Sequence, residues 1–503
     1  MRLYLLALLA LSLLAACAPA ADQGPQIAIT IQVDGQTRSL ALPQGSRVRQ
    51  ALGAAAIELG DLDRTEPPSY SELADGDEVR VIRVLEEFET EQLELPFISR
   101  TLPNESLPVG EQRLIQNGAN GLQEVHYRLL YEDGELVSRT EVRSMVLTQP
   151  VEEIIMIGAQ SPFSSVEISG RLAFISAGNA WVLEGASGSR RAVAITGDLD
   201  SGIFEVSPDG KWLLFTRRSS DDGNINELWV ASLDEGAQEL IDLNVANVGH
   251  YAGWMPGGSN QIAFTTVDPS LNPPGWQANN DLQIVTFEEG EVSTPREVLG
   301  PRADGFYAWW GTSYAWSPNG AQLAFSRADG VGTVNLDSDS LDVWFNLPAY
   351  QTGSDWVWIP GLSWNDDEGF YYVRYSANPP SFSLMLAGEE GNTPIAADVG
   401  MFAHPAAAPD GSQVAFLRAF IPAQSDISAY ELMVATSEGV SASLFPPEGA
   451  AGLQPQRVAW SPSAETGPMV AFIYEGNLWV VNVLSGEAQQ LTGDGLVAAV
   501  SWR

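Results

Sequence analysis

Apolar residues between positions 27 and 85 change their spacing twice. A hairpin pattern comes first, with a turn at Asp34-Gly35 and alternating apolar residues at Ile27, Ile29, Ile31, Val33, Leu40 and Leu42. A helical spacing follows at Val48, Leu52, Ala55, Ala56 and Leu59, and then a strand-like run at Val79, Val81, Ile82 and Val84. Two strands, a helix and another strand predict a small β-grasp domain over residues 27–85.

Residues 86–160 alternate like strands, as in Val125, Tyr127, Leu129 and Tyr131, and show no convincing helical pattern. Five glycines punctuate the stretch: Gly110, Gly118, Gly121, Gly134 and Gly158. Because glycine adopts positive φ at turns without steric cost, each of them alone is explained as a turn residue. The pattern predicts an all-β segment.

From about residue 161 onward, one pattern recurs roughly every 50 residues. Each copy has a strand that ends in a turn, an apolar second strand, a variable loop and a third strand. The turns begin at Val206, Trp254, Trp316, Trp364, Ala408 and Trp460, as in Trp316-Ser317-Pro318-Asn319-Gly320. Short antiparallel strands without helices predict the blades of a β-propeller, which hides strand edges by radial packing.

Both ends of the repeat region hold part of a blade. Residues 171–175 and 179–183 match a second and a third strand that lack a first, whereas residues 497–502 match a first strand that lacks a second. Joined, they complete a seventh blade. The sequence therefore predicts a seven-bladed ring over residues 161–503 that its C-terminal strand closes.

Two stretches resemble known domains. Gln32-Val33-Asp34-Gly35, Val48-Arg49-Gln50-Ala51-Leu52 and the run from Leu73 to Val79 resemble the ubiquitin-like domain of unknown function that precedes five-glycine modules in bacterial surface and wall-remodelling proteins. The ordered glycines of residues 86–160 resemble the five-glycine (G-five) domain. That resemblance implies a thin, extended spacer or adhesive stalk, in a family suspected of binding amino sugars.

The repeat over residues 161–503 resembles the TolB-like and dipeptidyl-peptidase-type propellers, which are built from Trp-Ser-Pro-Asp-Gly repeats. Two copies depart from the pattern, since the one at Trp364 lacks the proline and the one at Ala408 lacks the tryptophan. A peptidase of this kind would need a hydrolase domain with a Gly-x-Ser-x-Gly nucleophile elbow. No such elbow occurs in the sequence.

The N-terminus predicts export. Met1-Arg2 precedes an apolar run over residues 3–16, too short for the ~20 residues of a membrane span, which is typical of a signal peptide. The run ends in Leu14-Ala15-Ala16-Cys17, which resembles the lipobox of bacterial lipoproteins and implies removal of residues 1–16 and acylation of Cys17. Residues 17–26 would then be a tether that holds the protein at a membrane, facing the exterior or the periplasm. A plain secretory signal is the alternative.

Composition narrows the partners. With 64 acidic and 25 basic residues the chain has a net charge of −39, a field that repels phosphate backbones, so nucleic acid is not an expected partner. Three dispersed histidines and one cysteine leave no set of metal ligands, and we expect no metal or cofactor. The acidic run from Asp337 to Asp342 lacks the glycine and final glutamate of a helix-loop-helix calcium site, which favours a solvated loop.

Catalytic motifs are equally sparse. Besides the missing elbow, neither His-Glu-x-x-His nor a Gly-x-x-x-x-Gly-Lys phosphate loop occurs, and Lys211 is the only lysine. A pair of carboxylates could still cleave a glycan, but among 64 acids a pair in the sequence carries no information. We therefore expect a binding protein and not an enzyme.

Two sets of aromatic residues have different expected roles. Trp254, Trp316, Trp364, Trp460 and Trp502 share one repeat position and should pack between blades. The connections into the first strands lie around the channel, and their rings could stack on a sugar or clamp a peptide. The candidate ligand-binding residues there are Tyr251, Tyr307, Trp309, Trp310, Trp356 and Trp358. Alternatively these rings plug the channel, and His126, His250 and His404 are expected to be satisfied surface or core residues.

Together the patterns predict a mainly β, lipid-anchored protein of the cell envelope, with a ubiquitin-like module, a five-glycine module and a seven-bladed propeller. The favoured function is non-catalytic binding, either of cell-wall or extracellular polysaccharide through the stalk or of a protein or glycan through the propeller. A structural or assembly role, in which the propeller docks an envelope partner protein, is the second hypothesis. Cleavage of a glycan is the third.

Overall fold

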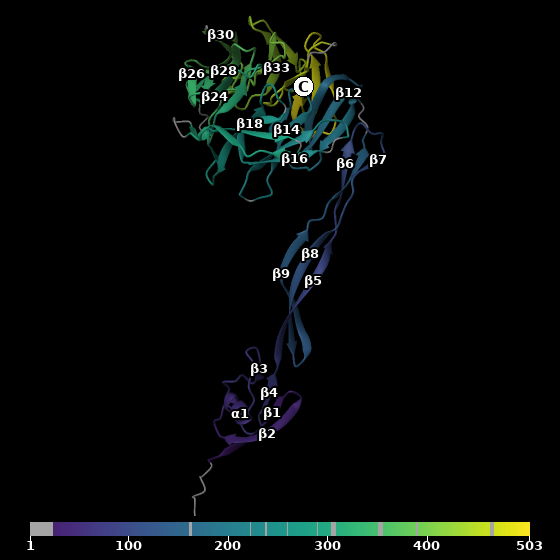
Figure 1. Cartoon of the computed structure of the whole chain (residues 1–503), viewed down its shortest axis with the longest axis vertical. Coiled ribbons are helices and arrows are strands. Elements are labelled where there is room, and N and C mark those ends of the chain that lie inside the picture. Colours follow the sequence, from purple (N-terminus) through teal and green to yellow (C-terminus); the bar gives the residue numbers. More distant parts are fainter. Residues whose placement is uncertain are drawn as a thin grey trace, which may run out of the picture. The chain divides into compact units, whose positions relative to one another are not determined.

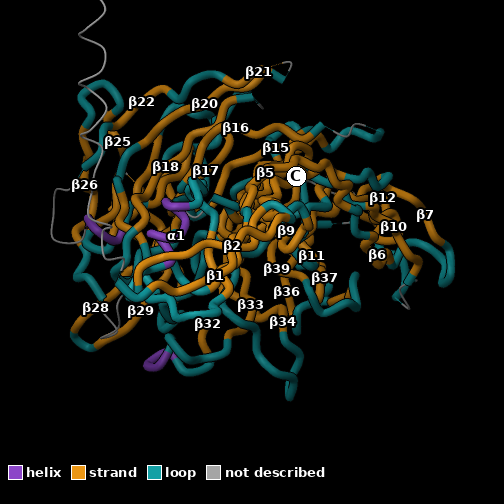
Figure 2. The backbone as a smooth tube through the Cα atoms, turned by 90° about the horizontal axis from the view of Figure 1, so that it is seen from below, coloured by secondary structure: helices purple, strands orange, loops and turns teal. Residues whose placement is uncertain are grey.

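A computed structural model describes residues 24–159, 163–221, 223–236, 239–258, 260–288, 290–302, 308–350, 356–388, 391–462 and 467–503. Figure 2 shows how strands dominate these ranges, with one α-helix, α1 (Val48–Ala54), and the 3₁₀ turns η1 (Ala308–Trp310) and η2 (Pro422–Gln424). No helix within them is long and apolar enough to cross a membrane. The expected signal peptide and Cys17 lie outside the described residues. The chain divides into two compact units, Met1–Leu102 with Gln112–Met156, and Pro103–Glu111 with Ile157–Arg503.

The first unit begins with a four-stranded sheet in the order β2–β1–β4–β3, formed by β1 (Gln26–Val33), β2 (Gln36–Pro43), β3 (Arg64–Glu66) and β4 (Glu78–Ile82). β1 pairs antiparallel with β2 and parallel with β4. Alternate residues of β1, such as Ile29 and Ile31, pack against Val48 and Leu52 of α1 in one core. The β-grasp prediction is confirmed, although α1 ends at Ala54 and β3 was not predicted.

Long strands of the five-glycine region follow. β5 (Val84–Leu95), β8 (Gly121–Glu132) and β9 (Glu135–Thr148) form an antiparallel sheet in the order β5–β8–β9. A second sheet has the order β6–β10–β7, from β6 (Ser99–Asn104), β7 (Gln112–Gln116) and β10 (Glu153–Gly158). Almost every side chain of β9 is exposed. The all-β expectation for this stretch is confirmed.

The five glycines serve two purposes. Gly110 and Gly134 have φ of 87° and 89°, so the turn explanation is right for them. At the other three a Cβ atom would collide with a neighbour: Gly118 with the ring of Phe97, Gly121 with the carbonyl of Thr148, and Gly158 with the carbonyl of Pro108. These three glycines therefore permit close approach of the chain to itself.

Seven antiparallel sheets make up the described part of the second unit, coloured from teal to yellow in Figure 1. The first strands of the blades are β13 (Leu199–Val206), β17 (Val248–Trp254), β23 (Ser313–Trp316), β27 (Leu362–Trp364), β31 (Ala406–Ala407), β35 (Ala459–Trp460) and β39 (Val497–Trp502). The second strands are β14 (Trp212–Arg218), β18 (Gln261–Pro269), β24 (Leu323–Arg327), β28 (Gly369–Ala377), β32 (Gln413–Ala419), β36 (Met469–Tyr474) and β11 (Glu167–Ser176).

Outside these lie the third and fourth strands. The third strands are β15 (Asn226–Ser232), β20 (Leu282–Glu288), β25 (Gly330–Asn335), β29 (Pro380–Gly388), β33 (Tyr430–Thr436), β37 (Asn477–Asn482) and β12 (Asn179–Ala194). The fourth are β16 (Leu240–Ala246), β22 (Arg296–Leu299), β26 (Ser340–Asn346), β30 (Gly391–Ala396), β34 (Ser441–Phe445) and β38 (Ala488–Gln490). Two short strands, β19 (Trp276–Ala278) and β21 (Glu291–Val292), extend the second blade.

The C-terminal strand completes the seventh blade. β39 pairs antiparallel with β11, which pairs with β12, and Leu172 lies opposite Trp502. The first strands also contact one another in a complete series, from β13 through β17, β23, β27, β31 and β35 to β39 and back to β13. The predicted seven-bladed ring, closed by its C-terminal strand, is confirmed.

The repeated turn and tryptophan hold neighbouring blades together. In the first copy Ser207 Oγ accepts the backbone N–H of Trp212 at 2.9 Å, and Gly210 has a φ of 74°. Three of the repeated tryptophans donate Nε1–H to a carbonyl of the preceding blade: Trp254 to Glu205 at 3.1 Å, Trp364 to Ala315 at 2.8 Å and Trp460 to Ala406 at 2.8 Å. These bonds confirm that the repeated tryptophans pack between blades.

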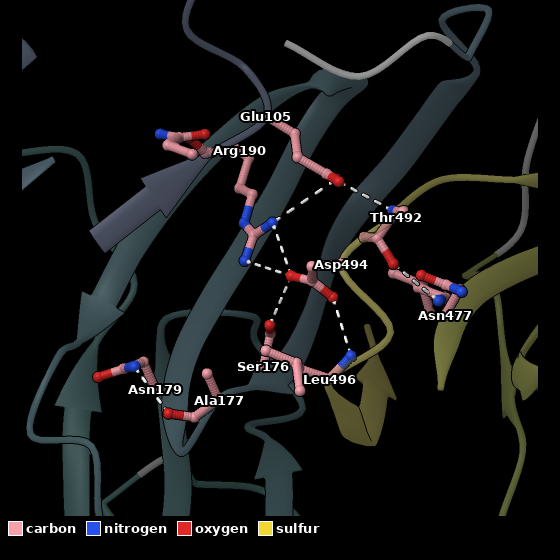
Figure 3. Close-up of polar contacts among 12 residues, drawn as sticks. Glu105, Ser176, Ala177, Asn179, Arg190, Asn477, Thr492, Asp494 and Leu496 are labelled. Atoms are coloured by element: carbon pink, nitrogen blue, oxygen red, sulfur yellow. Dashed lines mark hydrogen bonds and ion pairs between the residues drawn. The ribbon is translucent and has the colours of Figure 1, made fainter. Parts of the chain in front are cut away.

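Residues 103–111 belong to the propeller unit because of a buried ion cluster. Arg190 on β12 lies 3.7 Å from Glu105 and 3.5 Å from Asp494 (Figure 3). Its guanidinium also covers the ring of Trp181 at 4.0 Å. Asp494 also accepts a hydrogen bond from Ser176 Oγ at 2.7 Å. A segment from the middle of the five-glycine sequence thus packs against the blade that closes the ring.

Candidate functional site

A cavity of about 660 Å³ lies among the first strands of the propeller. Most of its wall comes from six blades, at or just before the first strand of each. Asn226 at the start of β15, Pro274 before β19 and Trp276 in β19 complete the lining. This placement follows from the blade fold, in which each innermost strand faces the ring axis. The volume falls within the range of sites that bind small molecules.

Four of the six predicted ligand-binding residues line this cavity, namely Tyr251, Trp310, Trp356 and Trp358. Trp309 is not among the described lining residues, although its neighbour Trp310 is. Tyr307 lies outside the described residues. The structure therefore brings together residues that are up to about a hundred positions apart in the sequence, as expected when each blade contributes one connection.

The four residues do not play one role. Trp358 is only 4% exposed, and its Nε1–H donates to the carbonyl of Met401 at 2.9 Å, so it belongs to the wall. Tyr251 packs edge-on against Tyr314 at 6.0 Å, and burial raises its pKa. Trp310 and Trp356 keep part of their surface exposed. The plug hypothesis fits Trp358, whereas Trp310 and Trp356 remain available to a ligand.

Three rings form a row along one wall. The planes of Trp356 and Phe402 differ by 20° with centroids 6.3 Å apart, and those of Phe402 and His404 differ by 16° at 6.0 Å. Burial, together with the nearby charge of Arg457, lowers the pKa of His404 to about 4. At neutral pH the row is therefore uncharged.

The histidines differ in their surroundings. His126 on β8 contacts Thr90 Oγ1 at 3.0 Å and Glu124 at 3.1 Å, as expected of a satisfied surface residue. His250 departs from that expectation, because its buried Nε2 has no hydrogen-bond partner among the described residues. Its ring packs edge-on against Trp276 at 4.7 Å. The ring fits there because residue 311 is a glycine, since a Cβ atom at that position would collide with it. Burial lowers the pKa of His250 to about 4.

Charged residues of the cavity were missed by the search for aromatic side chains. Glu205 on β13 and Arg457 both line the cavity, and Arg503 lies 3.8 Å from Glu205. Arg457 stands three residues before Trp460, as Tyr251 stands three residues before Trp254. Aligning the repeats by position instead of by residue type would therefore have pointed to Arg457.

Metal ligation has no counterpart in the part of the chain that the structure describes, where no three His, Cys, Asp or Glu residues gather closely enough to hold an ion. The acidic run from Asp337 to Asp342 crosses the hairpin between β25 and β26. Asn335 Oδ1 accepts the backbone N–H groups of Asp337 and Ser338 there, both at 3.1 Å. The geometry is that of a capped turn.

Comparison with protein families defines the class of the first unit. Residues 86–160 match the model of the G5 domain, and residues 29–69 match that of the G5-linked ubiquitin-like domain. The protein thus combines a ubiquitin-like domain and a G5 domain with a β-propeller.

Individual relatives cover only parts of the chain or show low identity. Resuscitation-promoting factor RpfB of Mycolicibacterium smegmatis is 26% identical over 168 residues, which are 32% of this chain and 46% of that protein. The match therefore spans less than half of this curated relative. TolB from Acinetobacter baumannii is 13% identical with a TM-score of 0.38, covering 83% of this chain and all of TolB. The propeller domain of the Trilobed protease from Pyrococcus furiosus is 11% identical with a TM-score of 0.36, covering 79% and 98%.

Proposed function

We propose that this protein is a non-catalytic binding protein of the cell envelope and that an acylated Cys17 holds it at a membrane. The protein binds cell-wall or extracellular glycan in its propeller cavity. The observation that carries the proposal is the combination of two partly exposed rings, Trp310 and Trp356, with a cavity among the first strands of the blades. Aromatic faces are suited to stacking on sugar rings. The G5 domain supports an envelope location and a stalk that contributes its own glycan contacts.

The titratable residues of the cavity favour binding over catalysis. A general base works best with a pKa near the operating pH. His250 and His404 have pKa values of about 4 because burial disfavours their charged forms. Their protonation would therefore not change near neutral pH, and they serve better as neutral parts of the wall.

Sedimentation with purified cell-wall sacculi and with extracellular polysaccharide tests this function in the whole protein. We expect Trp310→Ala with Trp356→Ala to lower retention at least about tenfold, by loss of stacking surface. Tyr70→Ala, which removes a 71% exposed ring in the ubiquitin-like domain, is the matched control and should bind normally. Capture of an envelope protein without any glycan retention would replace the proposal by the docking hypothesis, and turnover of polysaccharide would replace it by an enzyme.

The anchor has a separate test. Cys17→Ala should move the protein from the membrane fraction to the soluble fraction, because the acyl chains would no longer be attached. Ala18→Ser is a neighbouring control that leaves the thiol in place. Unchanged membrane association of Cys17→Ala would refute acylation at this residue without affecting the glycan proposal.

A further inference from the structure

Charge in the propeller cavity differs from charge elsewhere in the chain. The whole protein has a net charge of −39, and acidic residues outnumber basic ones by more than two to one. Among the described residues that line the cavity, the charged side chains are Glu205 and Arg457. A ligand that enters therefore meets a guanidinium in a protein whose overall field repels anions.

The carboxylate of Glu205 already has a cation beside it. Arg503 Nη2 lies 3.8 Å from Glu205 Oε1, and burial raises the pKa of Glu205 against the opposing effects of Arg503 and Arg457. Arg457 makes no hydrogen bond or ion pair with any described residue, although its side chain is exposed to the cavity. Glu205 and Arg457 thus balance in formal charge, but the N–H donors of Arg457 have no hydrogen-bond acceptor among the described residues and face the cavity.

The chain around Arg457 is held in place. The side chain of Gln456 donates a hydrogen bond to the carbonyl of Ile473 at 2.7 Å and accepts its N–H at 2.6 Å. Val458 on the other side is buried, 8% exposed, in the core shared by the fifth and sixth blades. Because both neighbours are fixed, little ordering of the backbone would be needed when Arg457 meets a ligand.

Flat aromatic surface adjoins this cation. The row of Trp356, Phe402 and His404 is parallel to within about 20° from ring to ring, and His404 at its end is close enough to Arg457 to sense its charge. Because the rings are stacked, Phe402 lies between its two neighbours, and Trp356 at the other end of the row is the ring that can offer a face to a ligand. The guanidinium of Arg457 offers two parallel N–H donors, which match the two oxygens of a carboxylate.

We propose that the cavity binds a saccharide that carries a carboxylate, with Arg457 pairing with the carboxylate and with Trp356 stacking on a sugar ring. This inference rests on the proposed glycan-binding function and deepens it. The carboxylate of Glu205 repels any anion in the cavity, and it repels a dianionic phosphate more strongly than a monoanionic carboxylate. An acidic peptide shares the carboxylate, but the partly exposed ring of Trp356 favours a ligand with a sugar ring.

Calorimetric titration of the whole protein tests the inference with matched pairs of probes. The probes are trisaccharides of glucuronate, galacturonate and mannuronate, together with N-acetylmuramate, each as the free acid and as its methyl ester. We expect at least one acid to bind, and its ester, which keeps the sugar but loses the charge, to bind about tenfold more weakly or worse. Raising the salt concentration should weaken binding of the acid and leave binding of the ester unchanged.

Variants assign the effect to one residue. Arg457→Gln should lower the affinity for the acid by about tenfold or more and leave the affinity for the ester unaffected. Arg457→Lys keeps the charge without the paired donors, so its affinity for the acid should lie between those of the unaltered protein and Arg457→Gln. Arg296→Gln, the same change at an exposed position on β22, is the control and should bind like the unaltered protein. Thermal melts of each variant establish that the propeller is folded.

Three outcomes would overturn the inference: equal affinity for acid and ester, no effect of Arg457→Gln in a folded protein, or binding of triglutamate in place of every acidic sugar. If neutral glycans are still retained through Trp310 and Trp356, the proposed function stands while this inference fails. If those two tryptophans do not matter for retention by sacculi either, both fail.

Discussion

The sheet β5–β8–β9 of the G5 domain and the blades of the propeller are both antiparallel, yet they are stabilised differently. Side chains of β9 are exposed on both faces of its sheet, and cross-strand contacts such as Arg139 with Glu91 at 2.6 Å and with the Tyr127 ring at 3.6 Å lie on the surface. In the propeller the second strands carry fully buried rings, among them Phe215, Phe264, Phe325, Phe416 and Phe472.

The difference shows what a thin sheet and a ring of sheets each depend on. A single layer has little apolar surface to bury, so backbone hydrogen bonds and glycines that permit close approach carry more of its stability. Packed blades gain most from side chains that fill the space between neighbouring sheets. The G5 sheet should therefore be less sensitive than the propeller to the loss of an aromatic side chain.

Removal of residues 497–503 should have the largest effect. Without β39 the strand β11 loses its partner, and the contacts of β39 with β13 and β35 disappear. We expect the free energy of unfolding to fall by several kcal/mol. In calorimetry the propeller should no longer unfold in one cooperative transition. The G5 sheet, which makes no use of β39, should melt as before. A propeller transition at its original temperature would contradict the role of the clasp.

Matched aromatic truncations sharpen the comparison. Phe264→Ala removes a ring that is 1% exposed and should cost about 3–5 kcal/mol, because it leaves a cavity between blades. Phe88→Ala in the G5 sheet removes a ring that is 69% exposed and should cost less than about 0.5 kcal/mol. Denaturant unfolding of both variants provides the measurement. Similar losses would mean that the G5 sheet buries its rings in a way that its exposure does not indicate.

Glycine substitutions test the close approach of strands within the G5 sheet. Gly121→Ala would drive a methyl group into the carbonyl of Thr148 and should destabilise the G5 sheet by about 1–3 kcal/mol. Gly53→Ala, at a helical position with open space, should be neutral or slightly stabilising. Hydrogen exchange of the backbone amides in β8 and β9 resolves the local effect. Unaltered protection in Gly121→Ala would show that the strands can move apart at little cost.

Acid should weaken the propeller first. His250 and His404 have folded pKa values of about 4, below the unfolded value of about 6.5, so the unfolded chain binds more protons between these limits. The contribution of these two histidines to the free energy of unfolding is fully present above pH 6.5. It declines as the pH falls toward 4, by roughly 1–3 kcal/mol for each residue. His404→Gln should reduce the decline in unfolding free energy between pH 7 and pH 4.5. An equal decline with the variant would assign the pH dependence to other groups.

The first unit should respond at lower pH and less strongly. A hydrogen bond from Arg83 holds the pKa of Asp34 below its usual range. Burial raises the pKa of Asp63, but the N–H groups of Val84 and Gly60 and the Arg83 guanidinium outweigh it, so that pKa is lowered as well. Stability from these carboxylates is present above their ordinary pKa near 4 and is lost below it. Circular dichroism of the first unit should therefore change only under more acidic conditions than the propeller.

Much of the fold could be predicted because its determinants are local. Alternation in β1, the Asp34-Gly35 turn and the Ser207-Pro208-Asp209-Gly210 turn each specify their geometry over a few residues. The ring closure could also be predicted, since two incomplete strand sets at the ends of a repeat complement each other. The boundary between units could not, because residues 103–111 join the propeller through Arg190 and Asp494, which are distant in sequence.

The candidate site was predicted only in part. Four aromatic residues could be placed at the cavity because they recur before the first strands, but nothing in the pattern separated Trp358, which is bonded into the wall, from Trp310 and Trp356. Arg457 carried no periodic signal of its own, since its charge alone distinguishes it from other residues of the connection. Its place in the cavity beside Glu205 depends on the assembly of different blades.

The amino-acid sequence by itself determined the order of domains, the blade repeat and the strand that closes the ring, because turns, alternation and glycine act over short stretches of chain. The tertiary structure alone decided which side chains share the cavity and which of its charged groups lack a hydrogen-bond partner. The physical reason is that electrostatic balance is a property of groups brought together from separate blades, and the sequence of no single blade contains it.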